Sequence, residues 1–386
     1  MRPFVFRTAA WRRALATSAL LVVMLSASCY RQAAEQPRQE SRSGPIRIGS
    51  VLFLTGPAAS YGAMQRSAFE IGRDEINSSG GIDGHPLEII YEDSEHSEPK
   101  AVAAVKKLIG VDKVPMILEV TGSGEALASA PVAQSSRIVL LSAIDSSPKL
   151  TESGSYFFRI MPSDLFQGRF LSDWGHAMNW KKAAILFVNN DWGVGMRDSV
   201  TASFTKAGGT IALTESSADE DLDFRTQFAK IKAAKPDGVF LLLYPQAAGR
   251  ALKQAKELGV RGPFLGGDAL SGSEVGATAG AASDGLMFCQ PSKGSGPVFD
   301  AFRKKYLDRF HDEPSVYSIK SYDAVKIAGE ALRHKGPTTE GVREYLDHLQ
   351  NYRGASGIIS LDANGDIVTQ EYDKYVYRSG KFERMN

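Results

Sequence analysis

The chain has 386 residues, of which 43% are hydrophobic and 23% are charged, close to the average of a soluble globular protein. This composition excludes a disordered chain, a collagen and a protein with several membrane spans. Four arginines lie in the first 13 residues, which leaves 41 basic and 44 acidic residues for the rest of the chain, with no long run of Lys and Arg. Nucleic-acid binding is therefore disfavoured. At about 150 residues per domain, the length predicts two or three domains.

Residues 1–28 have the layout of an export signal peptide. An arginine-bearing segment precedes an apolar run of 12 residues, Ala14–Leu25, and small residues follow before Cys29. A membrane-spanning helix needs roughly 20 apolar residues, so this run is too short for a permanent anchor. The general secretory route is favoured, although Arg12-Arg13 also fits twin-arginine export. The polar segment 29–45 is predicted to be a flexible tether.

The junction at Cys29 resembles the lipobox of bacterial lipoproteins. The resemblance implies that this cysteine is acylated and becomes the first residue of the mature chain. Position −3 holds Ser26, where that family prefers Leu, and Leu25 stands beside it. The alternative is an ordinary secreted protein that is cleaved nearby. Cys289 is the one other cysteine, so a disulfide framework is excluded, and its apolar surroundings predict a buried strand.

The body alternates strand-like runs with helical patterns. The first series begins with a strand at 46–54, and Met64, Ala68, Ile71 and Ile76 mark a helix that ends at Gly80-Gly81. Further strands are predicted at 87–91, 114–120 and 138–142, with helices at 101–109 and 126–134. A second series has helices at 166–178, 196–207, 224–233 and 248–258, and strands at 183–188, 210–213, 239–244 and 264–265. Such alternation predicts parallel sheets covered by helices on both faces.

The number of strands favours two doubly wound lobes over one, so the fold class is α/β. The carboxyl-terminal part differs, with helices predicted at 298–310, 318–332 and 341–349 and short strands at 357–360 and 372–377 that fit antiparallel edges. Ligands of open α/β sheets bind beyond the carboxyl ends of the strands. The loops that follow those strands are therefore the candidate site.

Two motifs have weak functional signals. Thr121-Gly-Ser-Gly-Glu follows a strand and opens a helix, but it lacks the third glycine of a dinucleotide fingerprint because position 127 is Leu. It could hold an anion at the helix N-terminus, with Ser123 as a donor, or be a bare capping turn. The segment 362–366 resembles the start of a calcium loop, but Ile367 replaces the required glycine, which favours a hairpin turn. The six histidines show no metal-ligand spacing, and none stands at a predicted strand end. We expect no metal, no cofactor and no enzymatic activity.

Longer segments carry a more specific resemblance. Ile48-Gly-Ser-Val-Leu-Phe-Leu-Thr-Gly-Pro, Glu75-Ile-Asn-Ser-Ser-Gly-Gly and Leu87-Glu-Ile-Ile-Tyr-Glu-Asp resemble the opening of the bacterial solute-binding proteins of branched-chain amino acid ABC transporters. Similar segments follow in family order to residue 380. The resemblance implies a type I fold, in which three crossovers join two lobes around the ligand. Lobe 1 is then 46–163 with 292–371, and lobe 2 is 164–291 with 372–386.

The family's ligand contacts, carried over by position, imply a binding site for a zwitterion. Ser123 and Ser146 would donate hydrogen bonds to a ligand carboxylate, and Asp268 would hold its ammonium group. Ile144 and the aromatic residues Tyr61, Trp192 and Tyr244 complete the implied site. A helix N-terminus, an acid at a strand end and aromatic loop residues agree with such a clamp. Taken singly, Tyr61 and Tyr244 could be core residues, Trp192 a surface residue and Asp268 a turn or helix cap.

Three acidic residues depart from the family pattern. Glu119-Val120 replaces a common Gly-Pro, Glu125 follows the implied carboxylate site, and Asp145 precedes Ser146. These carboxylates would weaken anion binding or select extra positive charge. Alternatively, Glu125 is a favourable partner for the helix dipole and Glu119 points away. Leucine is therefore not assumed as the ligand.

The resemblance implies an exported lipoprotein, in the periplasm or on the outer face of a membrane. It would capture an amino acid or a similar small polar solute and deliver it to an ABC permease. The alternative is a sensor that presents the solute to a membrane receptor. A dehydrogenase on doubly wound lobes ranks third, because the glycine fingerprint and candidate bases are missing.

Overall fold

The computed structural model describes residues 44–385 except 57, 261 and 369. The predicted signal peptide, Cys29 and most of the tether therefore lie outside the described residues. Residues Pro45–Asn386 form one compact unit. Within the described part of the chain, no helix is long and apolar enough to cross a membrane.

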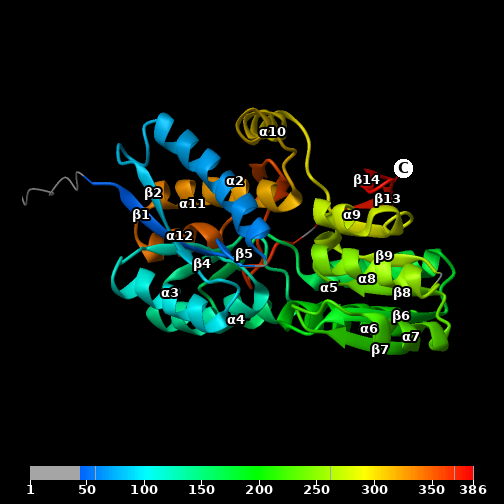
Figure 1. The fold of residues 1–386 in the computed structure, drawn as a ribbon. Coiled ribbons are helices and arrows are strands. Elements are labelled where there is room, and N and C mark those ends of the chain that lie inside the picture. Colours follow the sequence, from blue (N-terminus) through cyan, green and yellow to red (C-terminus); the bar gives the residue numbers. More distant parts are fainter. Residues whose placement is uncertain (1–43, 57, 261, 369, 386) are drawn as a thin grey trace, which may run out of the picture. The chain divides into compact units, whose positions relative to one another are not determined.

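A five-stranded parallel sheet forms the first half of this unit, in the order β2-β1-β3-β4-β5 (Figure 1). Its strands are β1 (Ile46–Leu52), β2 (Leu87–Asp93), β3 (Met116–Val120), β4 (Val139–Ser142) and β5 (Phe157–Arg159). Its helices are α2 (Ala59–Ser78), α3 (Glu98–Gly110), α4 (Ser123–Ser136), α11 (Val316–His334) and α12 (Thr339–Asp347). Successive side chains of β1 face opposite sides, as a strand requires. Leu52 joins the core beneath α11, while Val51 joins the core beneath α3 and α4.

A seven-stranded sheet forms the second half, in the order β14-β13-β10-β9-β8-β6-β7. Its parallel strands are β6 (Lys182–Val188), β7 (Thr210–Ser217), β8 (Gly238–Leu242), β9 (Phe264–Gly266) and β10 (Met287–Pro291), and its antiparallel edge is β13 (Tyr372–Arg378) with β14 (Lys381–Arg384). Its helices are α5 (Asp164–Ala177), α6 (Asp191–Lys206), α7 (Arg225–Ala234), α8 (Pro245–Glu257) and α9 (Ser273–Ala279). Hydrophobic cores lie on both faces of this sheet.

The chain passes between the two halves three times. It leaves the five-stranded sheet after β5, returns after β10 through α10 (Pro297–Phe310), and leaves again before β13. A two-stranded ribbon of β11 (Tyr352–Gly354) and β12 (Gly357–Ile359) precedes the last passage. This connectivity confirms the predicted α/β fold with two parallel-sheet lobes.

Some short elements were not predicted. The strands β5, β11 and β14 have only three or four residues, and α9 has seven residues rich in Gly and Ala, so none carries a clear period. The edge strand β7 extends to Ser217 rather than ending at 213. Because β7 pairs with β6 alone, at the edge of the sheet, it accommodates polar residues. These polar residues are the reason that the sequence pattern did not predict the extension.

Two sequence predictions outside the site are confirmed: the burial of Cys289 in a strand and the turn at 362–366. Cys289 is buried in β10. Residues 362–366 form a turn in which the Asp362 carboxylate accepts from the backbone N–H groups of Asn364 and Asp366, between the bridged residues Leu361 and Ile367. Among the described residues, no group of His, Cys, Asp and Glu side chains has the arrangement of a metal site.

Candidate functional site

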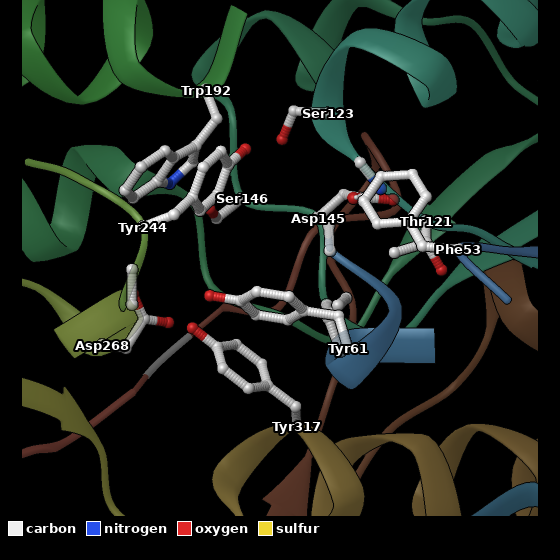
Figure 2. A pocket seen from close by; sticks show the side chains of 14 residues that line it. Phe53, Tyr61, Thr121, Ser123, Asp145, Ser146, Trp192, Tyr244, Asp268 and Tyr317 are labelled. Carbon is white, nitrogen blue, oxygen red and sulfur yellow. Dashed lines mark hydrogen bonds between the residues drawn. The ribbon is translucent and has the colours of Figure 1, made fainter. Parts of the chain in front are cut away.

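A cavity of about 50 Å³, here called the inner cavity, lies at the carboxyl ends of strands from both sheets. All seven residues that the sequence analysis assigned to the site line it: Tyr61, Ser123, Ile144, Ser146, Trp192, Tyr244 and Asp268. Figure 2 labels all of them except Ile144 and shows the labelled side chains converging from separate elements. Strand ends position most of them, because Ser123 follows β3, Ile144 and Ser146 follow β4, and Tyr244 and Asp268 follow β8 and β9.

Aromatic rings form much of the wall. Trp192 and Tyr244 stack with ring centroids 5.0 Å apart, and Tyr61 meets Tyr244 edge-on at 6.1 Å. Trp192 is 8% exposed, so its alternative interpretation as a surface residue is wrong. The amide of Asn190 donates to the Tyr244 hydroxyl at 3.2 Å. Burial raises the pKa of Tyr61 well above its usual value, so the phenol stays neutral.

Asp268 begins a short 3₁₀ helix after β9 and is 3% exposed. Burial raises the pKa of this carboxyl to about 6, although hydrogen bonds from Gln167 and Tyr317 favour its ionised form. Its neighbour Asp164 is also buried, and burial together with the charge of Asp268 raises the pKa of Asp164 well above its ordinary value. A cation placed at Asp268 would reverse part of this desolvation cost.

The hydroxyl groups implied as carboxylate donors already have partners within the chain. Ser146 Oγ donates to Asp164 Oδ2 at 3.0 Å. Ser123 Oγ accepts from the backbone N–H of Ser147 at 3.3 Å. At the start of α4, the N–H of Gly122 donates to Asp145 Oδ1 at 2.8 Å. Gly122 has a φ of +101°, and a Cβ there would collide with the ring of Phe53 and the Glu125 carboxylate.

Glu119 turns away from the inner cavity, as the alternative interpretation held. Its carboxylate accepts from the backbone N–H groups of Ala143 at 2.6 Å and Ile144 at 3.1 Å. Its φ of +75° is costly for a residue other than glycine, which explains why glycine suits this position. The two backbone hydrogen bonds offset that strain.

Asp145 differs from Glu119 because it lines the inner cavity. Burial and the charge of Glu119 raise the pKa of Asp145 well above its ordinary range, and burial raises the pKa of Glu119 as well. The hydroxyl of Ser142 lies within hydrogen-bond distance of both carboxyl groups. The buried pair therefore keeps a proton at neutral pH, since two adjacent carboxylates do not both ionise readily.

Among the lining residues that sequence reasoning missed are Phe53, His96 and Tyr317. Tyr317 lies on α11, far along the chain, and its ring meets Tyr61 at 5.3 Å. No strand end marks it in the sequence. No histidine stands at a predicted strand end, but β2 continues two residues beyond the predicted strand to Asp93, and His96 follows three residues later.

The His96 ring connects the two halves of the cleft. It packs against Phe53 at 4.6 Å and Tyr244 at 6.1 Å between ring centroids. Its Nε2 lies 3.9 Å from Glu125 Oε1 and 3.7 Å from Asp219 Oδ2. Asp219 comes from the loop after β7 and Glu125 from α4, so the imidazole faces an acid from each side.

Comparisons with known proteins show the family and the fold of this chain. The sequence profile of the periplasmic binding protein family matches residues 45–380. The leucine-, isoleucine-, valine-, threonine- and alanine-binding protein of Pseudomonas aeruginosa is 27% identical over 343 residues, covering 86% of this chain and 89% of the relative. A leucine binding protein of Thermotoga maritima has a similar structure, with a TM-score of 0.83, 25% identity and coverage of 88% of this chain and 98% of its own. A branched-chain amino acid transporter substrate binding protein of Streptococcus pneumoniae, solved with isoleucine, has a TM-score of 0.81, 26% identity and the same two coverages.

Proposed function

The chain belongs to the periplasmic binding protein family, and on this premise we propose that it captures an amino acid or a similar small polar solute and delivers it to an ABC permease. This is a family of binding proteins of transporters and not of enzymes. One observation carries the proposal: the seven residues implied by family position all line the inner cavity. Three of the relatives above are named for binding leucine or isoleucine, or hold isoleucine.

The ligand would be enclosed by a hinge motion of the lobes, which we propose as 46–163 with 292–371 and 164–291 with 372–386. Tyr61 and Ser123 come from elements of the five-stranded sheet, whereas Trp192, Tyr244 and Asp268 come from those of the seven-stranded sheet. Both halves are needed to surround a ligand. Three connections between them allow opening while keeping the two surfaces aligned.

Membership of this family implies an extracytoplasmic location. We further propose that the mature chain starts at an acylated Cys29, so that a lipid holds the protein at the membrane and the segment 29–45 lets it reach the permease. The short apolar run and small residues before Cys29 support this anchor.

Thermal-shift screening of the mature chain against amino acids and related small polar solutes tests the proposed capture. A ligand that binds only the folded state raises the melting temperature by mass action. The same ligand should lower the radius of gyration in solution scattering. As a matched control, Asp308→Ala removes an exposed carboxylate of α10, far from the cavity lining, and should keep the response. If no solute stabilises the protein, or if Asp268→Ala retains the full response, the cavity is not the capture site.

A further inference from the structure

The inner cavity holds acidic groups without a basic counterpart among the described residues. Within the part of the chain that the structure describes, its lining includes the carboxyl groups of Asp145 and Asp268 and no Lys, Arg or His side chain. Asp268 is almost fully buried, and its carboxyl group is directed toward the hydroxyl groups of Tyr61 and Tyr317 (Figure 2). A buried carboxylate without a cation is costly unless a partner arrives. A ligand that brings a cation to Asp268 supplies that partner.

At the opposite end of the cavity, the chain's own carboxyl groups take three donors that a ligand carboxylate would otherwise use. The N–H of Gly122 donates to Asp145, and the hydroxyl of Ser146 donates to Asp164. The N–H of Ile144 likewise donates to a buried glutamate. A ligand carboxylate would have to displace these bonds and would then face Asp145 in the same cavity. The backbone N–H that precedes α4 is therefore already bound to Asp145, and of the implied donors only the Ser123 hydroxyl keeps its proton for a ligand.

A second space of about 280 Å³, here called the outer compartment, adjoins the inner cavity. The two share Ser123, Trp192 and Tyr244 in their walls. Among the described residues, the acidic and basic side chains in its lining are three carboxyl groups and one imidazole: Glu98, Glu125, Asp219 and His96. Even a protonated imidazole leaves this compartment negative. Glu125 is 4% exposed, and within 4 Å its one basic neighbour among the described residues is His96, at 3.9 Å.

From these observations we propose that the ligand is an elongated organic dication without a carboxylate, such as a linear diamine or an aminoalkyl guanidine. This proposal rests on the proposed function and specifies the class of solute. One cationic group binds Asp268 in the inner cavity. The other lies among Glu98, Glu125 and Asp219 in the outer compartment, where its positive charge favours the ionised form of Glu125. The alkyl chain between them passes the stacked rings of Trp192 and Tyr244, whose faces suit apolar and cationic groups.

Titration calorimetry with 1,4-diaminobutane, 1,5-diaminopentane and 4-aminobutylguanidine tests the proposal, with 1-aminopentane and leucine as comparisons. We expect at least one dication to bind ten-fold or more tightly than 1-aminopentane, because only the dication reaches both acidic regions. Leucine should bind more weakly than that dication. In Glu125→Gln, the affinity for the dication should fall toward that for the monoamine, whereas Asp308→Asn should bind the dication as the unmodified protein does.

The results separate this proposal from the one it rests on. Tighter binding of leucine than of every dication would overturn the dication assignment and keep capture of an amino acid. Equal affinities for dication and monoamine, or an unchanged affinity in Glu125→Gln, would also overturn it. Failure of all these amines, together with failure of the amino acid screen, would remove both proposals.

Discussion

Trp192 and Tyr244 stack in the wall of the inner cavity, with ring centroids 5.0 Å apart and planes inclined by 19°. Trp192 lies in the first turn of α6, and Tyr244 immediately precedes α8. Two different strand-to-helix connections of the seven-stranded sheet therefore build one aromatic surface. Any ligand that enters the cavity touches this surface.

We expect tryptophan emission to report ligand binding through Trp192. Enclosing a ligand changes the surroundings of this indole, whereas Trp174 and Trp180 are buried in a core on the far side from the cavity lining. The emission of the mature chain should shift when a ligand found by thermal shift is added, and Trp192→Phe should abolish that shift. A shift that persists in Trp192→Phe would place the change at another tryptophan and contradict this assignment.

Asp268→Ala should weaken binding of a cationic or zwitterionic ligand by about 2–5 kcal/mol, which is roughly thirty-fold to several thousand-fold in Kd. The reason is that the variant leaves a buried ligand cation without its partner. Calorimetry measures the change, and circular dichroism checks that the fold is kept. Asp308→Ala, which removes an exposed acid, should leave Kd unchanged. Equal affinity in Asp268→Ala would mean that the ligand carries no cation at this position.

The stability of the protein should depend on the protonation of Glu125. Burial raises the pKa of this carboxyl to about 8, and Asp145, Glu98 and Asp219 add to the rise, while His96 is the basic group that faces it. Between about pH 4.5 and 8, the unfolded chain releases the proton that the folded chain keeps. The free energy of unfolding therefore falls as pH rises through this window.

Glu125→Gln should remove this contribution. Chemical denaturation at pH 5 and pH 8 gives the free energy of unfolding of both proteins. Relative to the unmodified protein, the value for the variant should be higher at pH 8 than at pH 5, by at most about 1.4 kcal/mol per pH unit. Taking the difference between the two proteins cancels the effects of other buried acids such as Asp268. A constant difference across this range would show that Glu125 is ionised in the folded protein at neutral pH.

Asp366→Ala should destabilise the fold by about 3–5 kcal/mol, because it leaves the buried guanidinium of Arg159 without its carboxylate partner. Arg159 is fully buried and forms two hydrogen bonds with Asp366, at 2.6 Å and 3.0 Å. Urea denaturation measures the loss, and Asp308→Ala should change stability by less than about 0.5 kcal/mol. A similar small effect in Asp366→Ala would show that Arg159 finds another partner or reaches water.

Cys29→Ser should abolish membrane attachment, since the hydroxyl cannot replace the thiol that carries the lipid. Cell fractionation should find the unmodified protein with membranes, and the variant either soluble or unprocessed. Mass spectrometry of the mature N-terminus checks the acylation directly. Identical fractionation and identical removal of the leader in Cys29→Ser would contradict the lipid anchor.

Most of the fold and the seven proposed ligand contacts could be predicted from the sequence. Strands such as β1 and β8 are apolar and regularly spaced. The family resemblance implied Ser123, Tyr244 and Asp268, and their places near strand ends agree with where such sheets bind ligands. Tyr317 could not be found in this way. It reaches the cavity because α11 packs on α2, which is a contact between distant segments.

The sequence by itself determined the alternation of strands and helices, because hydrophobic periodicity and turn residues act locally. It also showed that Glu119, Glu125 and Asp145 add carboxyl groups near the site. Only the tertiary structure decided what each of them does. Glu119 accepts from the backbone at 143–144, Asp145 accepts from the N–H of Gly122 before α4, and Glu125 faces His96 in the outer compartment. The physical reason is that the pKa and the partners of a carboxyl group depend on burial and on neighbours brought together from distant parts of the chain.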